Sequence, residues 1–246
     1  YPHPYIDAFG KEIMWKLANT VIIQEKQFAL FEMKKRPHAN IVVIPQGNYV
    51  DVYGPQWKGD RNQLRKSFGF AKDDIVLLSL GSVRPYKALP DLIGVIKKIS
   101  EQHKNIKLLI AGKVSEGYKQ FIISVVNKHP AIVLSFGFVP DEQIPELLAV
   151  ADFSVFYYKD SSLSSAAMIL SLSYGTPVIT RNIPASNMIV EGVNGYVFHS
   201  ALELEKTLMK IDSTPYLDRD TIISTIADQT WDSVAAKLRG VYRSVY

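Results

Sequence analysis

A basic turn directly follows the most apolar run of the chain. Residues 75–80 have the composition of a buried strand, and the turn after them begins with Gly81 and Ser82 and contains Arg84 and Lys87. Ligands of an open α/β sheet bind just beyond the carboxyl ends of its strands, and Arg and Lys together are suited to holding a diphosphate. We therefore predict diphosphate binding at this turn, with a solvated basic turn as the alternative.

Two more glycine-containing loops are predicted to follow strands at the same edge. Gly112 permits close approach of the backbone to a ligand, and Lys113 adds a positive charge beside it. In the other loop, Gly137, Phe138 and Val139 offer backbone groups and a ring face to a nucleobase. Both loops extend the predicted anion site towards a nucleotide.

A serine-rich loop at residues 160–165 opens a predicted helix. It contains Ser162, Ser164 and Ser165, and Ala166 follows it. Free N–H groups and the partial positive charge at a helix start attract anions, so this loop is a further candidate for binding phosphate. Simple N-capping by serine is the alternative interpretation.

The composition is that of an ordinary globular protein. Of the 246 residues, 47% are apolar and 21% are charged, and the formal net charge is +4. This modest, dispersed charge favours a pocket for an anionic small molecule over a nucleic-acid surface. The chain has no cysteine, which excludes disulfides and cysteine-based zinc sites, and its scattered histidines share no metal-ligand spacing.

No apolar run of the sequence is long enough to span a membrane, which takes about 20 residues. The chain begins with neither an initiator methionine nor a signal peptide. We interpret it as a fragment of a longer protein. We expect a cytoplasmic location and leave open peripheral association with the inner face of the membrane.

Strand-like apolar runs alternate with helical patterns from residue 75 onward. Continuous apolar runs are typical of strands covered on both faces, and the alternation favours a parallel sheet with right-handed crossovers. The predicted fold class is α/β, with a Rossmann-like doubly wound parallel sheet. The expected strands are residues 75–80, 106–111, 132–135, 153–157, 177–180 and 195–198, and the expected helices are residues 89–100, 117–128, 141–150, 165–173, 183–191, 220–227 and 231–242.

The first forty residues have a different pattern. Residues 6–35 predict a helix, a short strand and a second helix, which would form the last part of a preceding domain. The apolar run at residues 41–44 is expected to begin the main domain. We therefore predict two domains, residues 1–39 and residues 40–246.

Four motifs occur in a fixed order along the chain. They are the basic turn at residues 81–87, GFVP at residues 137–140, YGTPVI at residues 174–179 and EGVNG at residues 191–195. In this order they resemble the C-terminal, donor-binding half of retaining GT-B glycosyltransferases, the large group called family 4. The resemblance covers about residues 40–246, with residues 231–242 similar to the final helix of the family, and residues 6–36 are similar to the end of the acceptor domain of that architecture.

The resemblance implies a role for each matching position. Arg84 and Lys87 would hold the pyrophosphate of a nucleoside diphosphate sugar, and the turn at residues 137–139 would contact its base. The helix start at residues 164–166 would place backbone amides on the phosphate and the sugar.

Two carboxylates that are usual in the family are missing. Counting back from Gly175, the two glutamates of the family, eight positions apart, correspond to Ser162 and Leu170. The second normally holds the ribose hydroxyls, so ribose recognition has to come from other residues, and the first acts near the transferred sugar. The glycine usual after the motif lysine is also replaced, by Ala88.

The resemblance implies a hexosyltransferase-type glycosyltransferase with a nucleoside diphosphate sugar as donor and a polysaccharide or lipid-linked glycan as acceptor. This chain would supply the donor domain and would be inactive without an N-terminal domain of the same protein. No cofactor, no metal and no nucleic acid is expected. The missing carboxylates favour an alternative, a degenerate, non-catalytic domain that binds a nucleotide sugar or a protein partner. A sugar-nucleotide epimerase on the same fold is the third interpretation.

Overall fold

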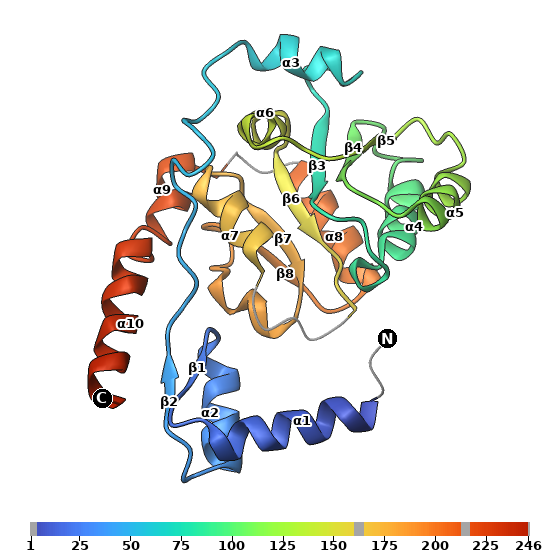
Figure 1. Cartoon of the computed structure of the whole chain (residues 1–246). Coiled ribbons are helices and arrows are strands. Elements are labelled where there is room, and N and C mark those ends of the chain that lie inside the picture. Colours follow the sequence, from blue (N-terminus) through green and yellow to red (C-terminus); the bar gives the residue numbers. More distant parts are fainter. Residues whose placement is uncertain (1–3, 160–164, 213–216, 246) are drawn as a thin grey trace. The chain divides into compact units, whose positions relative to one another are not determined.

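The computed structural model describes residues 4–159, 165–212 and 217–245. The chain divides into two compact units, Asn48–Ala227 and a smaller unit made of Tyr1–Gly47 and Asp228–Tyr246. The larger unit contains the six-stranded parallel sheet (Figure 1) and every predicted site residue that the structure describes. The predicted division of the chain into domains at residues 39 and 40 stays a prediction.

The larger unit is built on a six-stranded parallel sheet with the order β5-β4-β3-β6-β7-β8. The strands β4 and β5 are added on one side of β3, and β6, β7 and β8 are added on the other side. The order in which strands are added therefore reverses between β3 and β6, and ligands of such sheets bind at this point. The predicted doubly wound α/β fold is confirmed. The strands are β3 (Ile75–Leu80), β4 (Ile106–Gly112), β5 (Ile132–Phe136), β6 (Phe153–Phe156), β7 (Val178–Arg181) and β8 (Gly195–Phe198).

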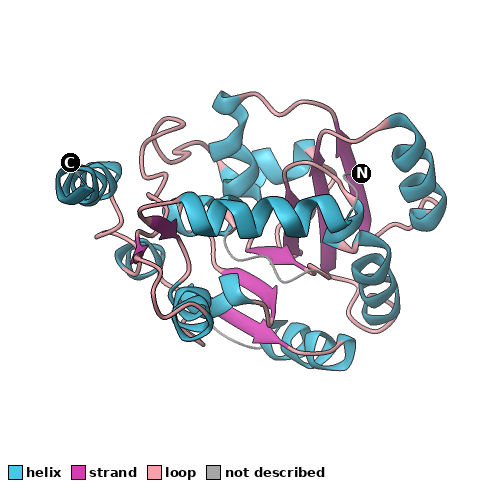
Figure 2. Ribbon diagram, turned by 60° about the horizontal axis from the view of Figure 1, so that its bottom comes forward, coloured by secondary structure: helices cyan, strands magenta, loops and turns pink. Residues whose placement is uncertain are grey.

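Helices cover both faces of this sheet (Figure 2). One face packs against α4, α5 and α8 in the largest apolar cluster of the unit. The other face packs against α3, α6, α7 and α9 in two further clusters. The strands are buried on both faces, which explains their continuous apolar sequences. The helices are α3 (Arg61–Ser67), α4 (Leu89–Ile99), α5 (Glu116–Val126), α6 (Ile144–Val150), α7 (Ala166–Ser173), α8 (Ala201–Asp212) and α9 (Arg219–Ser224).

Short 3-10 helices replace the first turn of one expected α-helix and the whole of another. η2 (Asp141–Gln143) precedes α6, and the helix expected at residues 183–191 is only η3 (Pro184–Met188). In η3, the Ser186 hydroxyl donates to the Ile183 carbonyl at 2.7 Å. The α-helix predicted there was wrong, and the physical reason is that such local bonds compete with α-helical pairing. The third 3-10 helix is η1 (Pro85–Lys87).

The smaller unit contains a two-stranded parallel sheet. β1 (Val21–Ile23) pairs with β2 (Ile41–Val43), so the apolar run that was expected to begin the main domain belongs to this small sheet. The remaining helices are α1 (Pro4–Leu17), α2 (Lys26–Lys35) and α10 (Trp231–Val245). Across the described ranges of both units, no helix has the length and apolar character needed to cross a bilayer.

Candidate functional site

The loops that follow β3, β4 and β5 lie side by side at the carboxyl edge of the sheet. Beyond the strands themselves, the Val83 N–H donates to the Lys113 carbonyl at 2.8 Å, and the Gly137 N–H donates to the Gly112 carbonyl at 3.2 Å. Val83 and Val114 also form an isolated parallel bridge. The pairing of the three loops therefore brings together the residues that the sequence predicted at this edge.

Gly112 is the residue that allows the first two loops to approach so closely. Its φ is +144°, and a Cβ at this position would lie 2.3 Å from the Gly81 carbonyl oxygen. No side chain fits there without moving backbone atoms. The structure thus gives this glycine a role in loop packing, while its predicted close approach to a ligand stays a prediction.

The basic turn forms η1, which Pro85 opens. Lys87 is buried, and its ammonium group donates to the Leu80 carbonyl at 2.8 Å. Burial lowers the pKa of Lys87 to about 8. The residue after the turn, Ala88, has φ +49°, in the left-handed region that favours glycine, which gives a physical reason for the glycine usual in the family there.

The basic turn is also fixed to the segment that leads into α7. The Lys159 N–H donates to the Tyr86 carbonyl at 2.9 Å. The rings of Tyr86 and Tyr158 pack with centroids 5.4 Å apart, and the Tyr158 hydroxyl lies 3.4 Å from the Ser165 hydroxyl. Burial raises the pKa of Tyr158 to about 12, so its hydroxyl stays protonated at neutral pH.

Ser165 is the N-cap of α7. Its hydroxyl oxygen accepts from the Met168 N–H at 3.3 Å, so its side chain has the simple capping role that was the alternative for this loop. Ala166 follows at the first helical position and faces a cavity. Ser162 and Ser164 lie outside the described residues.

A cavity of about 270 Å³ lies among these loops. Seven of its lining residues were predicted from the sequence as site residues, and six were not. The predicted ones are Gly81, Ser82, Gly112, Lys113, Phe138, Val139 and Ala166. The others are Tyr49, Tyr53, Leu80, Ile144, Ala167 and Leu170.

Four predicted residues that the structure describes do not line this cavity. Ser165 caps α7, Arg84 and Gly137 are exposed, and Lys87 is buried next to Gly81. A Cβ at Gly81 would lie 3.4 Å from the Lys87 ammonium nitrogen, so only the glycine backbone separates that charge from the cavity wall. The Phe138 ring lines the cavity and is 78% exposed, so its face is available to a planar ligand.

Two tyrosines of the cavity were missed by the sequence analysis. The rings of Tyr49 and Tyr53 stack with centroids 5.8 Å apart and an angle of 15° between their planes. Their segment is held against the end of α7, since the Tyr174 hydroxyl donates to the Gly54 carbonyl at 2.8 Å. The segment has neither a helical nor a strand period. The available sequence signal was the spacing of its two tyrosines, which are four positions apart and so compatible with a common face.

Leu170 forms part of the same wall, with its side chain half-buried in the adjoining apolar cluster. This is the position at which the resemblance predicts a carboxylate for the ribose. An apolar side chain therefore stands on the cavity wall at that position.

A family model describes this chain over most of the larger unit. The model of glycosyl transferases group 1 matches residues 60–219, which is more than half of the chain. The chain belongs to this family. The matched range contains the basic turn after β3, the loops after β4 and β5, and α7.

Two curated relatives match almost the whole chain. The Bacillus subtilis protein YtcC, which is named as a glycosyltransferase, is 25% identical over 97% of this chain. The lipopolysaccharide 1,2-N-acetylglucosaminetransferase of Salmonella typhimurium is 20% identical over 98% of it. The chain spans 63% and 61% of the lengths of these two relatives.

Solved structures share the fold. The Anabaena protein HepE, crystallised with UDP and glucose, superposes with a TM-score of 0.79 at 16% identity, over 96% of this chain and 66% of that one. The sucrose-phosphate synthase of Thermosynechococcus elongatus gives 0.80 at 15% identity, over 99% and 62%. These likenesses confirm the predicted fold, one Rossmann-like half of a GT-B architecture.

Proposed function

We propose that this chain is the C-terminal, donor-binding domain of a retaining glycosyltransferase of the family 4 type. The donor is a nucleoside diphosphate sugar, and a hexosyl group passes to a polysaccharide or lipid-linked glycan. The observation that carries the proposal is the cavity at the carboxyl edge of the sheet, lined by glycine backbone, Lys113 and Phe138, in a chain of the group 1 family.

The residues around the cavity suit the parts of such a donor. In the proposal the base packs on the exposed ring of Phe138. The diphosphate lies against Gly81 and Gly112, whose backbones leave room for it, and meets the charges of Lys113, Arg84 and Lys87. These groups stabilise the negative charge that develops on the leaving diphosphate.

Proteins similar to this chain support this donor and acceptor. HepE has been crystallised with UDP-glucose and with UDP and glucose. A Salmonella relative is named as a lipopolysaccharide acetylglucosaminetransferase, and a Candida glabrata relative as a chitobiosyldiphosphodolichol β-mannosyltransferase. We propose that an acceptor-side domain completes the enzyme and that this chain alone does not turn over. The proposed location is the cytoplasm, at or near the inner face of the membrane, and the proposed reaction uses no metal ion.

A second candidate is a non-catalytic domain that binds a nucleotide sugar or a partner. Leu170 on the cavity wall favours it, because a leucine cannot accept hydrogen bonds from ribose hydroxyls. A domain that binds only a protein partner predicts no nucleotide binding. A non-catalytic domain that binds a nucleotide sugar predicts the same binding as the enzyme, and transfer or donor hydrolysis by the chain together with an acceptor-side domain separates these two.

Calorimetric titration with UDP, GDP and ADP tests the proposal. One of the three is expected to bind best, and Arg84→Ala is expected to weaken that binding about tenfold or more, since a charge-assisted hydrogen bond is lost. Lys206→Ala removes an exposed lysine of α8 and should leave the affinity unchanged. Failure of all three nucleotides to bind would show that the cavity is not a donor site.

A further inference from the structure

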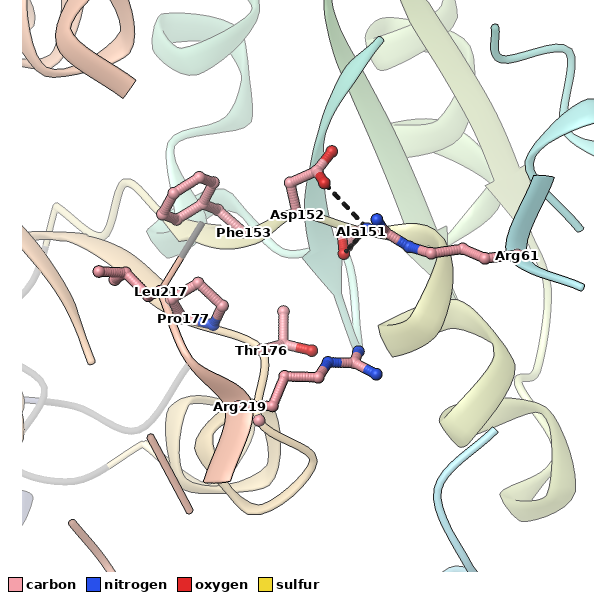
Figure 3. Close-up of a pocket in the computed structure, with 9 residues that line it drawn as sticks. Arg61, Ala151, Asp152, Phe153, Thr176, Pro177, Leu217 and Arg219 are labelled. Atoms are coloured by element: carbon pink, nitrogen blue, oxygen red, sulfur yellow. Dashed lines mark hydrogen bonds and ion pairs between the residues drawn. The ribbon is translucent and has the colours of Figure 1, made fainter. Parts of the chain in front are cut away.

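A second cavity lies at the amino edge of the sheet, opposite the donor cavity. Its volume is about 280 Å³ (Figure 3). Its walls come from the residues just before β6 and β7 and from the first residues of α3 and α9, whereas the donor cavity lies beyond the ends of β3, β4 and β5. The lining residues are Arg61, Ala151, Asp152, Phe153, Gly175, Thr176, Pro177, Leu217 and Arg219.

Arg61 reaches this cavity from α3 and is held in place by the loop before β6. Its Nε donates to the Ala149 carbonyl at 2.7 Å. Its Nη2 donates to the Ala151 carbonyl at 2.8 Å and to the Asp152 carboxylate at 2.9 Å (Figure 3). Its Nη1 has no hydrogen-bond partner in the part of the chain that the structure describes. The guanidinium is therefore preorganised and keeps donor capacity.

Asp152 cannot neutralise the cavity further, because its carboxylate is fully engaged. Besides Arg61, it accepts from the guanidinium of the buried Arg65 and from the Val76 N–H, the latter at 2.7 Å. Two arginines thus already share its single negative charge. Asp218, next to Arg219 in the chain, caps α9 by accepting from the Thr221 N–H at 2.8 Å and from its hydroxyl at 2.6 Å.

Arg219 enters the same cavity from the start of α9 (Figure 3). The turn before β7 packs directly on it: a Cβ at Gly175 would lie 2.9 Å from the Arg219 Cβ, and the φ of Gly175 is +67°. Within the described ranges, the Arg219 guanidinium makes no hydrogen bond and no ion pair. Burial, and next the charge of Arg61, lower the pKa of Arg219, whereas Asp152 raises it.

We propose that this cavity binds a phosphate-type oxyanion between Arg219 and Arg61. Among the lining residues, two guanidinium groups face one carboxylate, and that carboxylate also pairs with the buried Arg65, so the cavity carries an excess of positive charge. Planar guanidinium forks match the oxygen geometry of phosphate. Bound phosphate would connect α3 with α9 and so stabilise the larger unit. This site is separate from the proposed donor site and does not depend on it.

Thermal unfolding in sodium phosphate, compared with sodium chloride of equal ionic strength, tests the proposal. The melting temperature is expected to rise with phosphate concentration, as for any ligand that binds the folded state. Arg219→Gln is expected to weaken phosphate binding about tenfold or more, and Arg219→Lys, which keeps the charge and loses the fork, should lie between it and the unaltered chain. Lys206→Gln makes the same charge change on an exposed side chain of α8 and should keep the full rise.

Arg84→Ala separates this site from the donor site at the other edge of the sheet. It is expected to keep the phosphate-dependent rise, while Arg219→Gln loses it. The proposal is overturned if the unaltered chain shows no rise beyond that in chloride, or if Arg219→Gln keeps the rise. A rise that Arg84→Ala removes and Arg219→Gln retains would place the anion at the donor cavity and overturn it equally.

Discussion

Lys87 differs from the other basic residues near the donor cavity because its ammonium group is buried. Arg84 and Lys113 are exposed, and solvent screens their charges. Lys87 instead acts from behind Gly81 in a surrounding of low polarity, where a charge interacts more strongly with a ligand. We infer that Lys87 contributes strongly to diphosphate binding although its ammonium group is buried.

The pH dependence of binding tests this role of Lys87. Burial lowers the pKa of Lys87 to about 8, so in the free protein its charge is present below that pH and is lost above it. A bound diphosphate favours the charged form, so affinity is expected to be constant below about pH 7 and to fall as the pH rises through 8 and above. Calorimetric titrations between about pH 6.5 and about pH 9.5 measure this.

Lys87→Arg is the matched variant, because a guanidinium stays charged over this range. Its affinity should be nearly independent of pH even if it is lower overall. A decline equally steep in Lys87→Arg would mean that another group is responsible.

Phe138 gives a second prediction for a single residue. Base stacking on an aromatic ring is worth about 1–3 kcal/mol, so Phe138→Ala is expected to weaken nucleotide binding by that free energy without lowering the melting temperature. Phe121→Ala, which removes a half-exposed ring of α5 outside the cavity, is the control. Equal affinities for Phe138→Ala and the unaltered chain would exclude the ring as the base platform.

Secondary-structure elements were predictable where the sequence pattern indicated one type of element. β3 and β8 have the bounds that the sequence predicts, since continuous apolar runs ended by glycine or polar residues fit only buried strands. The predicted ends of the strands at residues 75–80, 106–111 and 132–135 placed Gly81, Gly112 and Phe138 at one edge, where they do line a common cavity.

Other elements depend on contacts that a local pattern does not contain. Tyr49 and Tyr53 reach the cavity through an irregular segment that is held by hydrogen bonds to the end of α7. The helix α3 was missed because Leu64 is its single apolar residue, whereas α8 was missed although Leu204, Leu208 and Ile211 recur at helical spacing. The cavity at the amino edge was missed too, because Arg61 and Arg219 are far apart in the chain and meet only in the fold.

The ion pairs of Asp152 connect α3 to the start of β6. Asp152→Ala would leave the buried Arg65 guanidinium without its carboxylate, which costs about 3–5 kcal/mol of unfolding free energy. Asp152→Asn keeps acceptor oxygen for the Val76 N–H and should cost less. Urea denaturation followed by circular dichroism measures both, and a loss below about 1 kcal/mol for Asp152→Ala would contradict the account of this network.

Gly112 determines how closely the loops after β3 and β4 approach. Gly112→Ala is expected to lower the unfolding free energy by at least about 2 kcal/mol, from the positive φ and the contact with the Gly81 carbonyl, and to weaken nucleotide binding as the loops separate. Gly117→Ala, in α5 with open space around it, should leave stability equal or raise it by up to about 1 kcal/mol. Similar stabilities for the two variants would rule out this close approach.

The chain belongs to the group 1 glycosyltransferases, whose family model matches residues 60–219, and it shares its fold with solved structures such as HepE. It spans 63% and 61% of two curated relatives, so its activity is proposed only together with an acceptor-side domain. The contribution that we propose for this chain by itself is recognition of the diphosphate. The central claim is therefore that the carboxyl edge binds a nucleoside diphosphate through Arg84 and Lys87.

The most direct test compares the best-binding nucleoside diphosphate with its nucleoside by calorimetry. The dissociation constant of the nucleoside divided by that of the nucleoside diphosphate isolates the contribution of the diphosphate. It is expected to fall about a hundredfold in the double variant Arg84→Ala, Lys87→Ala, and to stay unchanged in Lys72→Ala, Lys206→Ala, which removes two exposed charges outside the cavity. A ratio that is the same in the first double variant as in the unaltered chain would contradict the account.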